Sequence, residues 1–421
     1  MVVGKDNKKK LLVSGPINTV RLEGAIGKTK KVLYVMLDFH MDINSQTQCE
    51  DIRAQNITSY LVEQFDRVTG SDKTYDFFME IYPEMLTTKA TTQVTLKYGW
   101  AIQELFKKSF VYDPKKNKVV TSTTFPNIRF HYIDIRAYIK SELDKIFSSL
   151  GSHIDNMYHN KYVAAYDIDS LLDGISIAVS RLKVVYDLLY GKGDFDTVKK
   201  AHMPLVPATY KSLEQYTPEV VAEINRTIVA KIVGEHKYDS VKKVFGEFIN
   251  SSLRDQFHML LDLINAMYKY LQAAKKKLHT PNVLAKTTSS DGTEYYNYWR
   301  DTADDLEVVS TLSKMFVRIS EVEQDIMVGL VDLYFLRRFL NKDYITNGVI
   351  YTGALHSLFY VYMLVKYFDF KVTHASYSSE EVSKLNSLIK KAPSSFTLSK
   401  YFYPPTFNQC SDLTRFPPLF E

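Results

Sequence analysis

Cysteine is scarce in this sequence, because Cys49 and Cys410 are the only two in 421 residues. Two cysteines cannot build a disulfide framework or a cysteine zinc site, and such scarcity is typical of a reducing compartment, so redox chemistry is not indicated. No apolar run approaches ~18 residues, and the run at residues 11–13 is too short for a signal peptide. These absences predict an intracellular protein with no membrane span.

An excess of either charge is also missing. The 53 basic and 48 acidic residues give a net charge of +5, and the basic residues are mostly dispersed, which makes nucleic acid an unfavoured partner. The motifs HExxH, GxSxG, GxGxxG and the Walker loop are absent. What is abundant is tyrosine and phenylalanine, 30 and 24 residues, a usage that resembles AT-rich genomes, including those of large DNA viruses. That composition suggests the infected host cytoplasm or the virion as the location.

Two stretches near opposite ends of the chain share one pattern. Residues 32–40 and 349–356 are apolar, β-branched and aromatic runs of strand length, which stop at His40 and His356. A buried strand of a parallel sheet delivers a polar side chain to the sheet edge in this way, and ligands bind at the carboxyl ends of such strands. We therefore expect the two histidines to meet in one cleft.

Alternating strand and helix patterns fill the first ~145 residues. They predict a hairpin that feeds a core strand, followed by β–α–β units with right-handed crossovers. The expected fold class is α/β, with a mainly parallel central sheet and flanking helices. The predicted strands are 11–14, 19–23, 31–38, 75–81 and 127–136, and the predicted helices are 50–67 and 97–110.

Helical periodicity then dominates the middle of the chain, which predicts a large helical insertion or cap that splits the α/β domain. The strand and helix rhythm returns at residues 348–377, and the proline- and aromatic-rich tail is expected to lie as an irregular arm over a surface. The predicted helices of the middle are 168–190, 217–233, 238–278 and 304–341. The predicted division is 1–150 and 304–392 for the two parts of the α/β domain, 151–303 for the insertion and 393–421 for the tail.

Polar residues at the predicted strand ends are the candidates for chemistry. Asp38 and His40 point to the same face of a strand, which suits a metal site or a general base whose ring is oriented by the carboxylate. Glu80 follows an apolar strand, where a carboxylate is costly unless it is paired, metal-bound or facing a cleft. In each case a solvated side chain at a strand end is the alternative.

Further candidates lie on the predicted strand 127–136 and near His356. Asp134 and Arg136 share a strand face, where a structural ion pair is the alternative to a functional role. Gly353 permits close approach of a ligand at the turn from strand to helix, although an ordinary tight turn also explains it. Asp332 lies on a long helix, where a solvated face is the default expectation.

Together these motifs resemble the superfamily of TraB/Tiki proteins, erythromycin esterases and ChaN-like proteins. The carriers are a strand ending in Asp-x-His at 38–40, a strand ending at Glu80, Asp-x-Arg at 134–136 and Gly-x-x-His at 353–356. The chain looks most similar to uncharacterised giant-virus proteins of this type. In those proteins, stretches comparable to NIRFHYIDIR at 127–136, DLYFLR at 332–337 and YTGALH at 351–356 recur.

The resemblance implies a hydrolase-like site for an ester or peptide bond, with a small molecule or peptide as substrate. The catalytic residues it implies are His40, Glu80, Asp134, Arg136 and His356, with Gly353 binding the ligand. A divalent metal held by Asp38, His40, Glu80 and His356 is implied, with haem as an alternative cofactor. The competing hypothesis is an inactive virion or interaction protein that keeps the fold and binds protein partners through its helices and tail.

Overall fold

The computed structural model describes residues 10–41, 47–82, 98–113, 118–120, 122–160, 163–207, 225–234, 236–278, 284–298 and 303–420. The chain is a mixed α/β protein. Among the residues described, none of the helices combines the length and the apolar character that crossing a membrane requires.

The chain forms two compact units. Unit 1 contains residues 1–135, 236–244 and 331–421, and unit 2 contains residues 136–235 and 245–330. The last residues of helix α9 (Ala303–Asn341) belong to unit 1, and the rest of the helix belongs to unit 2. The sequence-based division into four segments stays a prediction.

A six-stranded sheet with the order β12-β2-β3-β11-β5-β8 forms the centre of unit 1. The four strands β3, β11, β5 and β8 run parallel to one another, whereas β12, β2 and β3 pair antiparallel, so the sheet is mixed. The strands are β2 (Asn18–Ile26), β3 (Thr29–Asp38), β5 (Tyr75–Met79), β8 (Ile128–Tyr132), β11 (Asn347–Gly353) and β12 (Lys371–Ala375).

Strand β11 comes from the far end of the chain and lies between β3 and β5. All seven of its residues are buried, as expected for a central strand that is covered on both faces. Gly353 pairs with Asp38, and Tyr351 pairs with Met79, one residue before Glu80. This register brings the carboxyl ends of three strands together.

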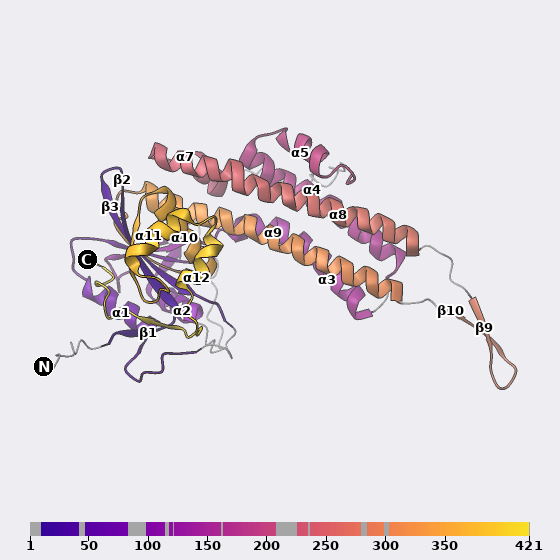
Figure 1. Ribbon diagram of the computed structural model, residues 1–421, viewed down its shortest axis with the longest axis horizontal. Coiled ribbons are helices and arrows are strands. Elements are labelled where there is room, and N and C mark those ends of the chain that lie inside the picture. The colour runs from indigo at the N-terminus through magenta and orange to yellow at the C-terminus, as the bar shows by residue number, and fades with distance from the viewer. Residues whose placement is uncertain are drawn as a thin grey trace. The chain divides into compact units, whose positions relative to one another are not determined.

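Helices cover both faces of this sheet (Figure 1). On one face α1 (Ile57–Arg67) and α2 (Tyr98–Ser109) pack on alternate strand residues such as Met36 and Phe77. On the other face Phe335 of α9 contacts Phe78 of β5, and also Tyr360 of α10 (Ala354–Tyr367). The alternation is the period-2 pattern of a strand that is buried on both sides.

Two local predictions about unit 1 are wrong. Strand β1 (Leu12–Ser14) pairs with β4 (Gln55–Asn56) and β13 (Cys410–Asp412), so it forms no hairpin with β2. The hairpin is instead made by β2 and β3 around Gly27, whose φ of +58° suits a tight turn. The predicted strand 127–136 ends at Tyr132, because α3 (Arg136–Asn160) begins at the residue predicted to end it.

The tail is part of the core of unit 1, which corrects the expectation of an irregular arm. Besides β13, it contains a 3-10 turn (Ser395–Leu398) and α12 (Ser399–Phe402), and it follows α11 (Val382–Lys391). Phe420 is buried and packs on Phe65 of α1 and Tyr75 of β5, with ring centroids 5.9 and 5.0 Å apart. Apolar burial of this kind explains why aromatic residues persist to the end of the chain.

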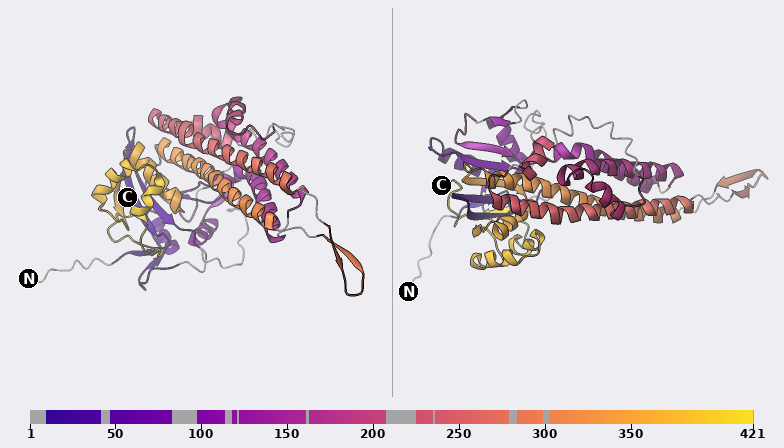
Figure 2. Two further views of the ribbon diagram at one scale, coloured as in Figure 1. Left: turned by 45° about the vertical axis from the view of Figure 1, so that its right-hand side comes forward. Right: turned by 90° about the horizontal axis from the view of Figure 1, so that it is seen from above.

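Unit 2 is helical, as the periodicity predicts. Helix α4 (Ala165–Tyr190) contacts both α3 and α8 (Arg254–Leu278), and Figures 1 and 2 show these helices side by side. The other helices are α5 (Asp194–His202), a π-helix (Asn225–Gly234), α7 (Asp239–Phe248), which unit 1 shares, and a π-turn (Ile249–Leu253). Residues 217–224 of the predicted helix 217–233 lie outside the described residues, and the remainder forms the π-helix.

A hairpin of two strands, β9 (Leu284–Thr288) and β10 (Glu294–Tyr298), interrupts this helical region. The sequence pattern predicts no strand in this part of the chain, so the hairpin was missed. A second small hairpin, formed by β6 (Val111–Asp113) and β7 (Lys118–Val120), follows α2.

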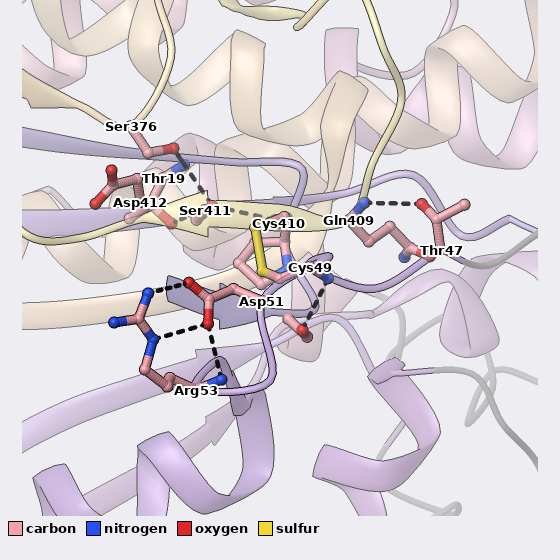
Figure 3. The surroundings of a disulfide bond; sticks show 12 residues. Thr19, Thr47, Cys49, Asp51, Arg53, Ser376, Gln409, Cys410, Ser411 and Asp412 are labelled. Atoms are coloured by element: carbon pink, nitrogen blue, oxygen red, sulfur yellow. Dashed lines mark hydrogen bonds and ion pairs between the residues drawn. A yellow bond between two sulfur atoms is a disulfide. The ribbon is translucent and has the colours of Figure 1, made fainter. Parts of the chain in front are cut away.

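A disulfide joins Cys49 to Cys410 across 361 positions of sequence (Figure 3). The backbone N–H groups of Cys49 and Gln409 donate to the hydroxyls of Ser14 and Thr47, so both ends of the bridge are tied down. A bridge between these two cysteines was not expected from the sequence. The compartment drawn from cysteine scarcity also loses its basis, since disulfides are rare in reducing compartments.

Breaking the disulfide should lower the free energy of unfolding by about 2–4 kcal/mol, because the bridge closes a very long loop of the unfolded chain. Urea denaturation of the oxidised and the reduced protein measures the difference. The double variant Cys49→Ser/Cys410→Ser is the control, because a reductant should leave its stability unchanged. Equal stability of oxidised and reduced wild-type protein would contradict the predicted bridge.

Candidate functional site

The carboxyl ends of β3, β5 and β11 are neighbours in the sheet and deliver Asp38, Glu80 and Gly353 to one place. The loop after β3 adds His40, and the first turn of α10 adds His356. The two histidines come together, because both contact Glu80, but His356 is buried and does not line the cavity beside His40, so the expectation of one shared cleft holds only in part. All of these residues belong to unit 1.

Glu80 is buried and is the common partner in this group. Its Oε2 accepts hydrogen bonds from the hydroxyl of Thr352 and the backbone N–H of Gly353, both at 2.9 Å. The Nε2 atom of His40 lies 3.5 Å from Oε2, and that of His356 lies 3.2 Å from Oε1. Burial alone would raise the pKa of Glu80, but the charges and hydrogen bonds of His356 and His40 hold that pKa well below its usual range.

His356 is held between two carboxylates. Its Nδ1 lies 2.6 Å from Asp332 of α9, a residue with no exposed surface, while Nε2 faces Glu80. Burial alone would lower the pKa of His356, but Asp332 and Glu80 raise it well above its usual value. Burial raises the pKa of Asp332 itself. The expectation of a solvated face at Asp332 is therefore wrong.

His40 has the same kind of environment but remains accessible, with 52% of its side chain exposed. Its Nδ1 lies 2.9 Å from Oδ2 of Asp38, whose Oδ1 accepts a hydrogen bond of 3.2 Å from Gln409. Burial alone would lower the pKa of His40, but the two carboxylates raise it to about 10. Its φ of +46° is uncommon outside glycine, so the surroundings hold the ring in place at some backbone cost.

Gly353 makes this close packing feasible. A Cβ at this position would lie 3.0 Å from Nε2 of His40 and 3.3 Å from Oε2 of Glu80. Its own φ is −53°, which any residue can adopt, so the requirement for glycine is one of space. Gly353 also precedes α10, where the start of the helix favours a carboxylate such as Glu80.

A cavity of about 150 Å³ opens beside His40. Its walls combine the polar groups of Asp38, His40 and Glu80 with apolar and aromatic side chains. The remaining lining residues are Met79, Ile81, Gly99, Trp100, Gln103 and Tyr351. A few polar groups in an otherwise apolar hollow are typical of a small-molecule site.

The predicted metal ligands form ion pairs and hydrogen bonds with one another. In the part of the chain that the structure describes, no three His, Cys, Asp or Glu side chains are arranged to hold a metal ion. Both ring nitrogens of each histidine face a carboxylate instead. The predicted metal site stays a prediction.

Asp134 and Arg136 lie beyond the end of β8 and do not share a strand face. Asp134 is buried in the connection to α3, and Arg136 is the first residue of that helix, in unit 2. Their predicted catalytic roles stay predictions. The sequence analysis missed Thr352 and Gln409, and only the position of Thr352 beside Gly353 could have indicated a role.

Gly353→Ala should displace His40, because the added methyl group meets the ring and the Glu80 carboxylate. We expect the pKa of His40 to fall from about 10 toward 6.5, measured by NMR titration of the imidazole. Gly246→Ala is the matched control, since a Cβ there meets nothing within 4 Å. An unchanged His40 titration in Gly353→Ala would show that the predicted contact is absent.

Glu80→Gln should lower the free energy of unfolding by about 3 kcal/mol at neutral pH, because it leaves His356 facing a neutral amide. A carboxyl whose folded pKa is depressed stabilises the fold above its unfolded value of about 4.5 and loses that effect as the pH falls. The stability gap between the wild type and the variant should therefore narrow below pH 4.5.

Chemical denaturation between pH 7 and pH 3 measures that gap. The exposed Glu380 supplies the matched control, and Glu380→Gln should stay close to the wild type throughout. A gap that is constant across this range would be incompatible with the depressed pKa.

Comparison with known proteins identifies relatives along the whole chain. Uncharacterized protein R706 of Acanthamoeba polyphaga mimivirus is 33% identical over 418 residues, which are 97% of each chain. Uncharacterized protein R161 of the same virus is 32% identical over 442 aligned positions, with 99% of each chain covered. No solved structure matches. The family model described as "Family of unknown function (DUF5847)" matches residues 11–421, and the chain belongs to this family.

Proposed function

We propose that this protein is a hydrolase of ester or peptide bonds, of the TraB/Tiki and erythromycin-esterase type, that works by proton transfer at His40. The observation that carries the proposal is an unbroken alternation of carboxylates and imidazoles: Asp38, His40, Glu80, His356 and Asp332. Perturbed titratable groups of this kind beside a cavity are typical of active sites. Asp38 and His40, at one end of this series, line the cavity, and the ring of His40 is accessible there.

Two residues of the cavity wall, His40 and Asp38, donate and accept the protons that hydrolysis requires. Water adds to the carbonyl carbon of the substrate, the bond to the leaving alkoxide or amine breaks, and the leaving group takes up a proton. His40 in its protonated form donates that proton, and the Asp38 carboxylate accepts the one that water loses. Asp38 then releases its proton to solvent and Nε2 of His40 takes one up, which restores the starting state.

The buried residues position these two groups. His356 has 7% of its side chain exposed and both of its nitrogens engaged, so its role is to hold Glu80 in place rather than to meet substrate. Glu80 in turn faces Nε2 of His40. No step is assigned to a metal ion, because the donors are already paired with one another.

The proposal is tested with a panel of p-nitrophenyl esters and labelled peptides. His40→Gln should lower kcat by at least about 100-fold, as removal of a general acid does. It should also lower the free energy of unfolding, because Asp38 and Glu80 lose their charged partner, so kcat is compared under conditions in which both proteins are folded. His159→Gln is the matched control, because His159 is an exposed histidine in α3 and its Nδ1 bonds only its own turn at Asp155.

Metal content by mass spectrometry and haem absorbance are recorded on the same samples. Stoichiometric metal that is lost in His40→Gln would replace the proton mechanism by the metal-assisted one. A wild-type protein that hydrolyses nothing in the panel would favour the competing class, an inactive virion or interaction component that keeps the fold.

A further inference from the structure

The hydroxyl group of Tyr351 is a polar group of the cavity that the proton mechanism does not use. Tyr351 lies on the central strand β11, is 1% exposed, and lines the cavity beside Asp38. Its hydroxyl has no hydrogen bond of ordinary geometry among the residues that the structure describes, although Asp38 lies close enough to interact with it. A buried hydroxyl without a partner is costly, so its persistence in a cavity wall indicates that a ligand supplies the partner.

Tyr351 remains a donor throughout the ordinary pH range. Burial, and then the nearby charge of Asp38, raise the pKa of the phenol well above its usual value of 10. A neutral phenol beside a carboxylate offers its proton to an acceptor, and a carbonyl oxygen that gains negative charge during hydrolysis is the acceptor to which it binds best.

The rest of the wall suits an apolar ring. Met79, Ile81 and Trp100 supply apolar and aromatic surface, and the indole of Trp100 is 44% exposed. Gly99 keeps the space beside Asp38 open, because a Cβ there would lie 3.7 Å from Oδ2. A cavity of about 150 Å³ is of the size that holds one benzene molecule.

We propose that this cavity is the acyl-binding subsite of the enzyme and takes a group of the size of a single aromatic ring, with the carbonyl oxygen of that acyl group accepting a hydrogen bond from Tyr351. The assignment of the acyl group rests on the proposed hydrolase function, whereas binding of the ring does not. The preferred substrates are then benzoyl-type esters or amides rather than acetyl or naphthoyl ones.

Binding is tested without turnover by the fluorescence of Trp100. The chain has two tryptophans, so full-length Trp299→Phe leaves Trp100 as the sole reporter. Titration with benzamide should give a saturable change, whereas acetamide and 2-naphthamide should not. Tyr351→Phe should weaken benzamide binding about five- to tenfold, as the loss of one hydrogen bond does, with Tyr75→Phe as the buried-tyrosine control.

Kinetics then separate the subsite from the chemistry. On benzoyl esters Tyr351→Phe should lower kcat more than it raises KM, because the hydrogen bond strengthens as the oxyanion forms. If the protein binds benzamide but hydrolyses no substrate, the proposed ring-binding subsite is supported and the proposed hydrolase function is overturned. Failure of the wild type to bind benzamide, or equal binding by Tyr351→Phe, would overturn the subsite even if esters are hydrolysed.

Discussion

The burial of the Glu80 carboxylate is the constraint on which the rest of the site depends. A carboxylate removed from water costs several kcal/mol unless charges and donors replace the solvent. Here the replacements are Thr352, Gly353 and two histidines. They come from β11, from α10 and from the loop after β3, so Glu80 is satisfied only when β11 has entered the sheet between β3 and β5. The insertion of β11 between β3 and β5 therefore both stabilises the buried carboxylate and assembles the site.

The C-terminal segment holds Asp38, the carboxylate that contacts the other ring nitrogen of His40. Asp38 is oriented by Gln409, and the next residue, Cys410, is bonded to Cys49. Strand β13 pairs with β1 in the same segment, and Phe420 lies in the aromatic core. The C-terminal segment thus fixes the position of the carboxylate that orients His40. These contacts give the segment a defined place in unit 1, although its sequence has no regular periodicity.

Apolar runs of strand length that stop at a polar residue were the most informative part of the sequence. The strands that end at His40 and His356 could be placed at one sheet edge, because buried parallel strands are continuous apolar runs and their polar side chains collect at the carboxyl ends. The long helices followed from their periodicity in the same way. Neither argument depends on contacts between distant segments.

Two of the failures have one physical source, which is tertiary pairing between residues far apart in sequence. Nothing near Asp332 indicates that a histidine 24 positions later will bury it, and an aspartate on a long helix is usually solvated. The partners of β1 are separated from it by about 40 and 400 positions, so its local sequence could not exclude a hairpin with β2. Asp134 and Arg136 were misplaced because a strand and the first turn of a helix were read as one apolar run.

The two histidines that the sequence pattern treats alike are made different by their positions in the fold. His356 lies in the first turn of a buried helix, where both nitrogens face carboxylates and 7% of the side chain is exposed. His40 lies in a loop after its strand, with positive φ, and 52% of its side chain is exposed. Both hold a proton tightly, because each is flanked by two carboxylates, but only His40 can pass that proton to a molecule in the cavity. The different roles of the two histidines, proton donor and positioning residue, therefore follow from their solvent access rather than from their proton affinity.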